Sequence, residues 1–164
     1  MKGGTVNNNV FKRACRNVLF IMMLFLCCET TYANEISRIN LDDLENIISD
    51  NKGKVVLVNM WTTWCPYCRK ELPGFSSLQK KYNGKVEIIG IAFDENGEQV
   101  VPPFLRKWNV TYTNYLAGED ITSGFSLLGF PTTIIYDTNG KEVNKHIGYV
   151  SEQDFEKEIN EILE

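Results

Sequence analysis

The spacing of apolar residues along the chain predicts alternating strands and helices. Three apolar runs rich in β-branched residues predict strands that are buried on both faces of a sheet, at residues 54–60, 86–93 and 132–137. Helical periodicity predicts helices at residues 41–48, 66–82, 102–108 and 121–128 and a last helix starting at Ser151. Residues 112–116 are expected to be extended. Residues 141–149 should return as a hairpin partner of the third buried strand, across an Asn-Gly turn.

After the first helix, these elements follow the order β-α-β-α-β-α-β-β-α. The chain shows no internal repeat, linker or low-complexity segment, and its 164 residues suit one domain. The order predicts a single α/β domain.

The first 33 residues have the layout of a secretory signal peptide. Four basic residues precede an apolar run at residues 18–28, and small residues occupy Thr31 and Ala33 before the expected cleavage point. An uncleaved anchor is the alternative, although a membrane span needs about 20 apolar residues. Lipid attachment at Cys27 or Cys28 is disfavoured, because a bulky leucine precedes Cys27.

Cleavage after Ala33 would leave one domain at residues 34–164, in the periplasm or elsewhere outside the cytoplasm. The leader takes four of the 17 basic residues and one of the 21 acidic residues, so the remaining domain has a net charge of −7. An acidic domain without a basic run is a poor nucleic-acid binder. We therefore expect no nucleic-acid partner.

Only Cys65 and Cys68 remain as cysteines after residue 33. A structural zinc site needs four ligands, and this range adds only His146 to the two cysteines. A structural disulfide would close a loop of two residues and would stabilise little. Their position favours thiol–disulfide exchange, because a buried strand leads into Cys65 and a helix begins just after it. A helix N-terminus favours a thiolate at Cys65, and Cys68 lies one turn later, where it can resolve a mixed disulfide.

Three stretches of the sequence carry a family resemblance. They are VVLVNMWTTWCPYCRKELP, GFPTTIIYDTNGKE and the extra segment between the second and third buried strands. With these features, residues 36–163 resemble the thioredoxin superfamily, and in particular the TlpA/ResA-like exported thiol–disulfide oxidoreductases. The resemblance implies a thioredoxin-like fold, with a central mixed sheet flanked by helices and an insertion between the second and third buried strands.

The resemblance also implies roles for residues around the motif. Cys65 would be the nucleophile and Cys68 the resolving thiol, joined in a disulfide when oxidised. Pro131 would be cis and would leave the backbone beside Phe130 free to pair with an extended substrate. The residues expected to contact substrate are Trp64, Pro66, Tyr67 and Phe130, with simple packing as the alternative role of Phe130.

Two features depart from thioredoxin itself, namely Asn59 and the Pro66-Tyr67 dipeptide. Asn59 stands where thioredoxin carries a buried aspartate, and an asparagine cannot act as a base. Glu71 matches a glutamate of the ResA-like proteins and is expected to manage protons instead, unless it is an ordinary surface residue. The Pro66-Tyr67 dipeptide also occurs in glutaredoxins and in one exported disulfide isomerase, so it leaves the redox potential open.

The leading functional hypothesis is a monomeric reductase outside the cytoplasm that needs no cofactor and no metal. It would reduce disulfides in exported proteins such as apocytochrome c, and a membrane electron donor of the thiol-relay type would recharge it. An oxidase or isomerase of protein disulfides is the alternative within redox chemistry, and the reduction potential separates the two. A copper chaperone using both cysteines and His146 is a weaker alternative, because such proteins place three residues between the cysteines.

Overall fold

The computed structural model describes residues 36–125 and 127–164. The expected signal peptide at residues 1–33, with its alternatives of an anchor or a lipidated cysteine, lies outside the described residues. Within the described ranges, no helix has the length and apolar character needed to cross a membrane.

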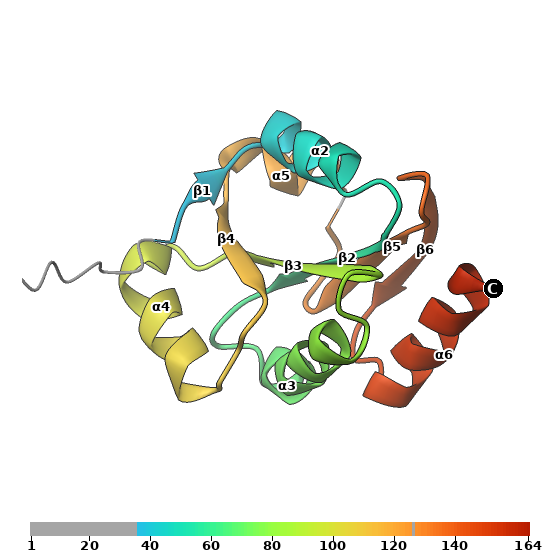
Figure 1. Ribbon diagram of the computed structural model, residues 1–164. Helices are drawn as coiled ribbons and strands as arrows, with labels where there is room; N and C mark the ends of the chain where they lie inside the picture. Colours follow the sequence, from blue (N-terminus) through green and yellow to red (C-terminus); the bar gives the residue numbers. More distant parts are fainter. Residues whose placement is uncertain (1–35, 126) are drawn as a thin grey trace, which may run out of the picture. The chain divides into compact units, whose positions relative to one another are not determined.

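Six strands form one mixed sheet (Figure 1). Their order in the sheet is β1-β4-β3-β2-β5-β6. The strands are β1 (Arg38–Ile39), β2 (Val55–Trp61), β3 (Val86–Ala92), β4 (Thr113–Ala117), β5 (Thr132–Tyr136) and β6 (Glu142–Ile147). Strands β1 to β4 pair in parallel, whereas β5 runs antiparallel to both β2 and β6. The mixed sheet confirms the predicted fold class.

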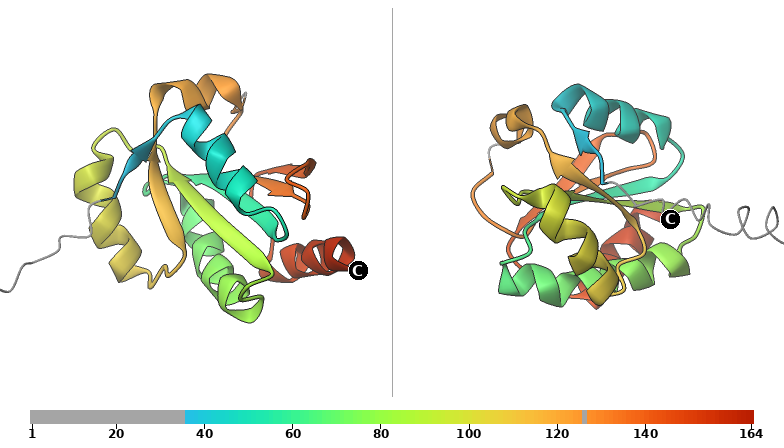
Figure 2. Two further views of the ribbon diagram at one scale, coloured as in Figure 1. Left: turned by 45° about the horizontal axis from the view of Figure 1, so that its top comes forward. Right: turned by 90° about the vertical axis from the view of Figure 1, so that its left-hand side faces the viewer.

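Helices cover both faces of the sheet, which gives three layers (Figures 1 and 2). One face carries α2 (Leu41–Asp50) and α5 (Glu119–Gly124), and the other carries α3 (Pro66–Lys81), α4 (Gly97–Lys107) and α6 (Glu152–Leu163). The central strand β2 serves both layers because its side chains alternate between the faces. Val55 and Leu57 pack toward α3, while Val56 and Val58 pack toward α2. This double burial explains why the sequence of β2 reads as a continuous apolar run.

The segment between β3 and β5 confirms the predicted insertion, but two of its helices have other bounds than expected. Helix α4 begins at Gly97 rather than at residue 102, because Val101 is fully buried and continues the helix ahead of the two prolines. Gly97 itself lies so close to Leu116 of β4 that a Cβ atom would overlap its side chain. Helix α5 spans Glu119–Gly124 rather than residues 121–128.

The two-residue strand β1 was not predicted from the sequence. It exists through pairing with β4, in which the backbone N–H of Leu116 donates to Ser37 O at 2.9 Å and that of Gly118 donates to Ile39 O at 2.7 Å. Such a short strand leaves no periodic pattern in the sequence.

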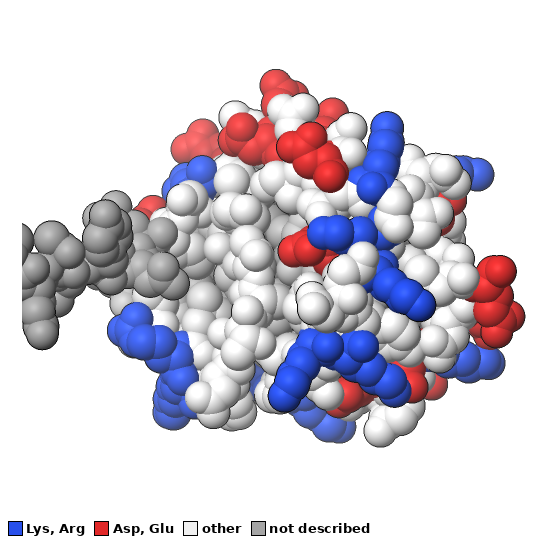
Figure 3. Space-filling model, viewed as in Figure 1, with Lys and Arg blue, Asp and Glu red and all other residues white. Residues whose placement is uncertain are grey.

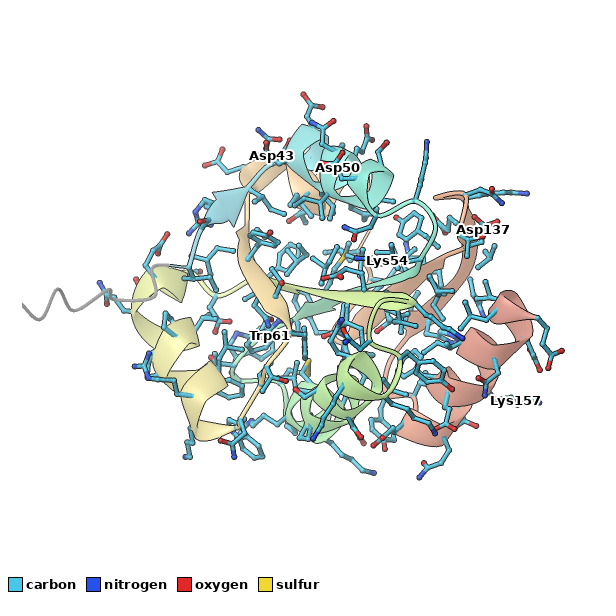
Figure 4. All side chains as sticks on the ribbon, viewed as in Figure 1. Asp43, Asp50, Lys54, Trp61, Asp137 and Lys157 are labelled. Carbon is cyan, nitrogen blue, oxygen red and sulfur yellow. A yellow bond between two sulfur atoms is a disulfide. The ribbon has the colours of Figure 1, made fainter. Side chains whose placement is uncertain are left out.

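Trp61 is the last residue of β2 and is fully buried just before the loop that leads to Cys65. The indole lies between the sheet and the layer of α3 and α4 (Figure 4), and it packs on Phe104 of α4 with the ring centroids 5.3 Å apart. Its Nε1 donates a hydrogen bond to Asn114 Oδ1 at 3.1 Å. Gly90 of β3 makes room for this bond, since a Cβ there would overlap Asn114 Oδ1 and approach Trp61 Nε1 to 3.0 Å.

We expect Gly90→Ala to lower the free energy of unfolding by about 2 kcal/mol, because the added methyl group overpacks the site and separates Trp61 from Asn114. Urea unfolding followed by tryptophan fluorescence measures this change. Gly129→Ala is the control, because a Cβ at Gly129 meets no atom within 4 Å. Unchanged stability of Gly90→Ala would show that Asn114 can move aside at no cost.

Candidate active site

The loop from Thr62 to Trp64 joins β2 to α3 and is held by hydrogen bonds to an aspartate that follows the neighbouring strand β3. Asp94, which is buried just after β3, accepts the backbone N–H of Thr63 at 3.0 and 3.2 Å and its hydroxyl at 2.5 Å. The backbone N–H of Phe93 also donates to Trp61 O at 2.9 Å. These bonds to the end of β3 hold the approach to the cysteines in place.

Cys65 and Cys68 are joined in a disulfide at the N-terminus of α3, as predicted. Cys65 is the N-cap, Pro66 is the first helical residue, and the two cysteine Cα atoms lie 5.3 Å apart. The backbone N–H of Cys68 points at Cys65 Sγ over 3.1 Å. An N–H donor and the positive end of the helix dipole both favour a thiolate at Cys65 in the reduced protein.

The two cysteine residues differ in exposure. Cys65 retains 4% exposure, whereas Cys68 is completely buried. Of the two residues, only Cys65 therefore has surface in contact with solvent.

The loop before β5 contains the expected cis peptide bond, between Phe130 and Pro131. Pro131 O accepts the N–H of Gly148 at 2.8 Å, and Thr132 Oγ1 donates to Gly129 O at 2.7 Å. Within the described residues, no hydrogen bond engages the backbone N–H or C=O of Phe130.

Aromatic side chains surround the disulfide. Trp64 is 64% exposed and Tyr67 is 62% exposed. The half-buried ring of Phe130 meets Trp64 edge-on, at 6.1 Å between centroids, so the cis-proline loop lies beside the residue that precedes Cys65. Pro66 is exposed between Trp64 and Tyr67. The structure thus brings together the four residues predicted to contact substrate.

Sequence reasoning missed Tyr149 and Leu128, which add to the exposed apolar surface. Tyr149, in the loop between β6 and α6, lies 6.5 Å from the ring of Tyr67, and Leu128 is 81% exposed in the loop before the cis-proline. No local pattern identifies either residue, and only the fold brings Tyr149 beside Tyr67 of the motif. His146 is half-buried on β6, where its Nε2 lies 2.9 Å from Glu158 Oε1.

Glu71 is buried one turn after Cys68, on the inner side of α3. Its Oε2 accepts a hydrogen bond from Asn59 Nδ2 of β2 at 3.0 Å, and its Oε1 accepts the backbone N–H of Val150 at 3.0 Å. Burial raises the pKa of Glu71 to about 7, and these two hydrogen bonds only partly oppose the rise. A carboxyl group of this kind exchanges a proton near neutral pH.

The polar neighbours of Glu71 are themselves incompletely bonded. Asn59 Nδ2 also donates to Thr133 Oγ1 at 3.0 Å, but Asn59 Oδ1 and the hydroxyl of Tyr112 have no partner among the described residues. Burial, together with the nearby carboxyl of Glu71, raises the pKa of Tyr112 well above its usual value. Tyr112 therefore stays protonated and acts here as a neutral hydroxyl.

The buried carboxyl group should make the stability of the oxidised protein depend on pH. The folded state holds the Glu71 proton up to about pH 7, whereas the unfolded chain releases it near pH 4.5. The stabilisation is therefore fully present below pH 4.5 and is lost as the pH rises to 7, with a total of about 3 kcal/mol.

We expect Glu71→Gln to remove this decline, which urea unfolding between pH 4.5 and 7.5 would measure. In the control Glu95→Gln, which replaces an exposed residue after β3, the wild-type decline should persist. A parallel decline in Glu71→Gln and the wild type would contradict the assignment.

Comparisons with known proteins identify the family of this chain. A family model described as a thioredoxin-like domain matches residues 42–163. The thioredoxin-like protein YneN of Bacillus subtilis is 30% identical over 80% of this chain and 79% of that protein. The thiol-disulfide oxidoreductase ResA of Bacillus cereus is 35% identical over 70% of this chain and 67% of that protein.

A crystal structure described as a thiol:disulfide interchange protein DsbE from Chlorobium tepidum is also similar. Its TM-score is 0.65 at 25% identity, and the match covers 71% of this chain and 85% of that chain. The chain therefore belongs to the thioredoxin-like family and, through its Cys65–Cys68 pair, is a thiol–disulfide oxidoreductase of the ResA and DsbE type.

Proposed function

We propose that this protein reduces disulfides in exported proteins, outside the cytoplasm. The observation that carries the proposal is the arrangement of Cys65, Cys68 and Glu71 at the start of α3. Cys65 is nearly buried, Cys68 is fully buried, and the carboxyl group of Glu71 has a pKa of about 7. Together these groups suit two-electron exchange in which the carboxyl group accepts the proton of a thiol. The proposal takes residues 1–33 as the export signal, either cleaved or retained as an anchor.

The reaction begins with the reduced protein. The Cys65 thiolate attacks one sulfur of the client disulfide, which breaks, and a mixed disulfide forms between Cys65 and the client. The released client thiolate takes up a proton. Cys68 then loses its proton and attacks Cys65 Sγ, which frees the second client thiolate and forms the Cys65–Cys68 disulfide. Two electrons pass to the client, and both client sulfurs end as thiols.

Glu71 is proposed to take the proton from Cys68. The two residues are three positions apart on α3 and therefore neighbours on one helix face. Cys68 is completely buried, so water is a poor base for its thiol, and an internal carboxylate substitutes for it. When Glu71 is protonated, the same group can return the proton during the reverse reaction.

The client is proposed to bind as an extended segment along the cis-proline loop. The backbone of Phe130 would pair with the client, Pro131 would hold that backbone in place, and the side chains of Trp64, Pro66 and Tyr67 would cover the client beside its disulfide. Apocytochrome c is the kind of client that the family resemblance suggests. A membrane electron donor of the thiol-relay type, itself a dithiol, would reduce Cys65–Cys68 again, and the protein would act as a monomer.

The reduction potential of the Cys65–Cys68 pair tests the proposed direction. We expect a value at or below about −220 mV at pH 7, as in thioredoxin-like reductants. Equilibration against glutathione or dithiothreitol, followed by tryptophan fluorescence, measures it. A value near about −120 mV would instead indicate an oxidase that donates its disulfide, and the proposed direction would be wrong.

The role of Glu71 predicts a slower resolving step in Glu71→Gln. We expect reduction of a Cys-x-x-Cys peptide disulfide to slow about a hundredfold at pH 7. The rate should recover toward about pH 8.5, where a thiol ionises without help. Stopped-flow fluorescence across pH gives the profile, with Glu95→Gln as the control. An unchanged rate and unchanged titration of both thiols would end the proposal for Glu71.

A further inference from the structure

An open groove of about 340 Å³ lies directly beside the nucleophile. It is lined by Pro66, Arg69, Lys70 and Trp108. Pro66 follows Cys65 in the chain, and Arg69 Nη2 donates to the carbonyl oxygen of Trp64 at 3.3 Å. The groove therefore adjoins Pro66 and Trp64, two of the residues proposed to contact substrate.

The groove has an aromatic wall supplied by the inserted segment. Trp108 is the C-cap of α4 and stacks on Phe104, with the ring centroids 5.9 Å apart. Phe104 in turn packs on Trp61, so this wall is anchored in the core. The last turn of α4 also carries Arg106 and Lys107, which do not line the groove, and basic side chains gather over α4 at the lower left of Figure 3.

The two cations of the groove have no carboxylate partner. No acidic residue lines the groove, and neither Arg69 nor Lys70 takes part in an ion pair within the described residues. Lys70 Nζ lies over the ring of Tyr149 at 4.2 Å, and Arg69 Nε is buried without a hydrogen-bond partner among the described residues. Both side chains are therefore held in place, while the ammonium group of Lys70 and the outer N–H groups of the Arg69 guanidinium have no carboxylate partner among the described residues.

The position of these cations is unfavourable for the helix that carries them. Arg69 lies in the first turn of α3, which holds no acidic residue, and the helix dipole disfavours positive charge there, while Lys70 follows at the start of the second turn. Acidic side chains instead gather over α2 at the top of Figure 3, where Asp43 and Asp50 lie (Figure 4). A positive charge at a helix N-terminus is locally unfavourable, and such an unfavourable residue beside a reactive group points to a functional role.

We propose that this groove binds a carboxylate side chain of the client polypeptide, a few residues from the client's disulfide. The guanidinium group of Arg69 and the ammonium group of Lys70 supply the charge, and Trp108 packs against the aliphatic part of the acidic side chain. Clients with an acidic residue near the reactive cysteine are thus preferred. This inference rests on the proposed function, because it requires a polypeptide disulfide as the substrate of Cys65.

Two peptides that differ only in charge test the preference. Each contains one Cys-x-x-Cys disulfide, flanked on both sides by Glu in the acidic peptide and by Gln in the neutral peptide. Stopped-flow fluorescence gives the second-order rate constant with the reduced protein. Each constant is divided by that of the same peptide with dithiothreitol, which removes differences in the intrinsic reactivity of the peptides.

We expect the wild type to favour the acidic peptide about fivefold, as two partly exposed charge pairs allow. The preference should fall to about one in the double variant Arg69→Gln/Lys70→Gln and should shrink at high salt. Lys80→Gln is the matched control, since it removes one exposed charge from the last turn of the same helix and should retain the preference.

Three outcomes would overturn the inference. The wild type could show no preference, or the double variant could retain it. The double variant could also slow both peptides by the same factor, which would mean that the two cations stabilise the Cys65 thiolate instead. If neither peptide reacts while a small aromatic disulfide does, the proposed function fails together with this inference.

Discussion

The active site depends on one buried carboxyl group that joins three parts of the chain. Glu71 belongs to α3, one of its oxygens is bonded to Asn59 of β2, and the other is bonded to the backbone of Val150 before α6. The position of α3 against the sheet is thus set by polar contacts as well as by apolar packing. Burying a carboxyl group carries a cost in free energy, and here that cost appears as a raised pKa. The group that orders the site is therefore also the group best suited to exchange a proton within it.

The elements with strong local patterns could be predicted from the sequence. Strands β2, β3 and β5 are buried on both faces, so each appears as a mainly apolar run rich in β-branched residues. The cysteine pair could be placed at a helix N-terminus, because a strand ends just before it and Pro66 suits the first helical position. By contrast, β1 depends on pairing with β4, which lies far away in the sequence.

Apart from the cis-proline loop, which the family resemblance identified, the site could be predicted only where its residues are close to the motif. Asn59 is a polar residue inside an apolar strand, and such a residue signals a buried partner without identifying it. That partner is Glu71, whose second bond goes to Val150, a residue 79 positions away. Tyr149 packs near Tyr67, and Trp108 lines a groove with Pro66. Both come from a loop or a helix end that has no distinctive sequence pattern. The redox chemistry is therefore encoded locally, whereas the surface around it is assembled by the fold.

The insertion between β3 and β5 separates two tasks that many enzymes combine in one segment. The cysteines and Glu71 lie on α3, whereas Trp108 comes from α4, outside the strand–helix unit that performs the exchange. Changes in α4 can alter the surface beside Cys65 without touching the cysteines, their helix or the buried carboxyl group. A fold organised in this way can diversify its choice of protein substrates during evolution while its electron chemistry stays constant.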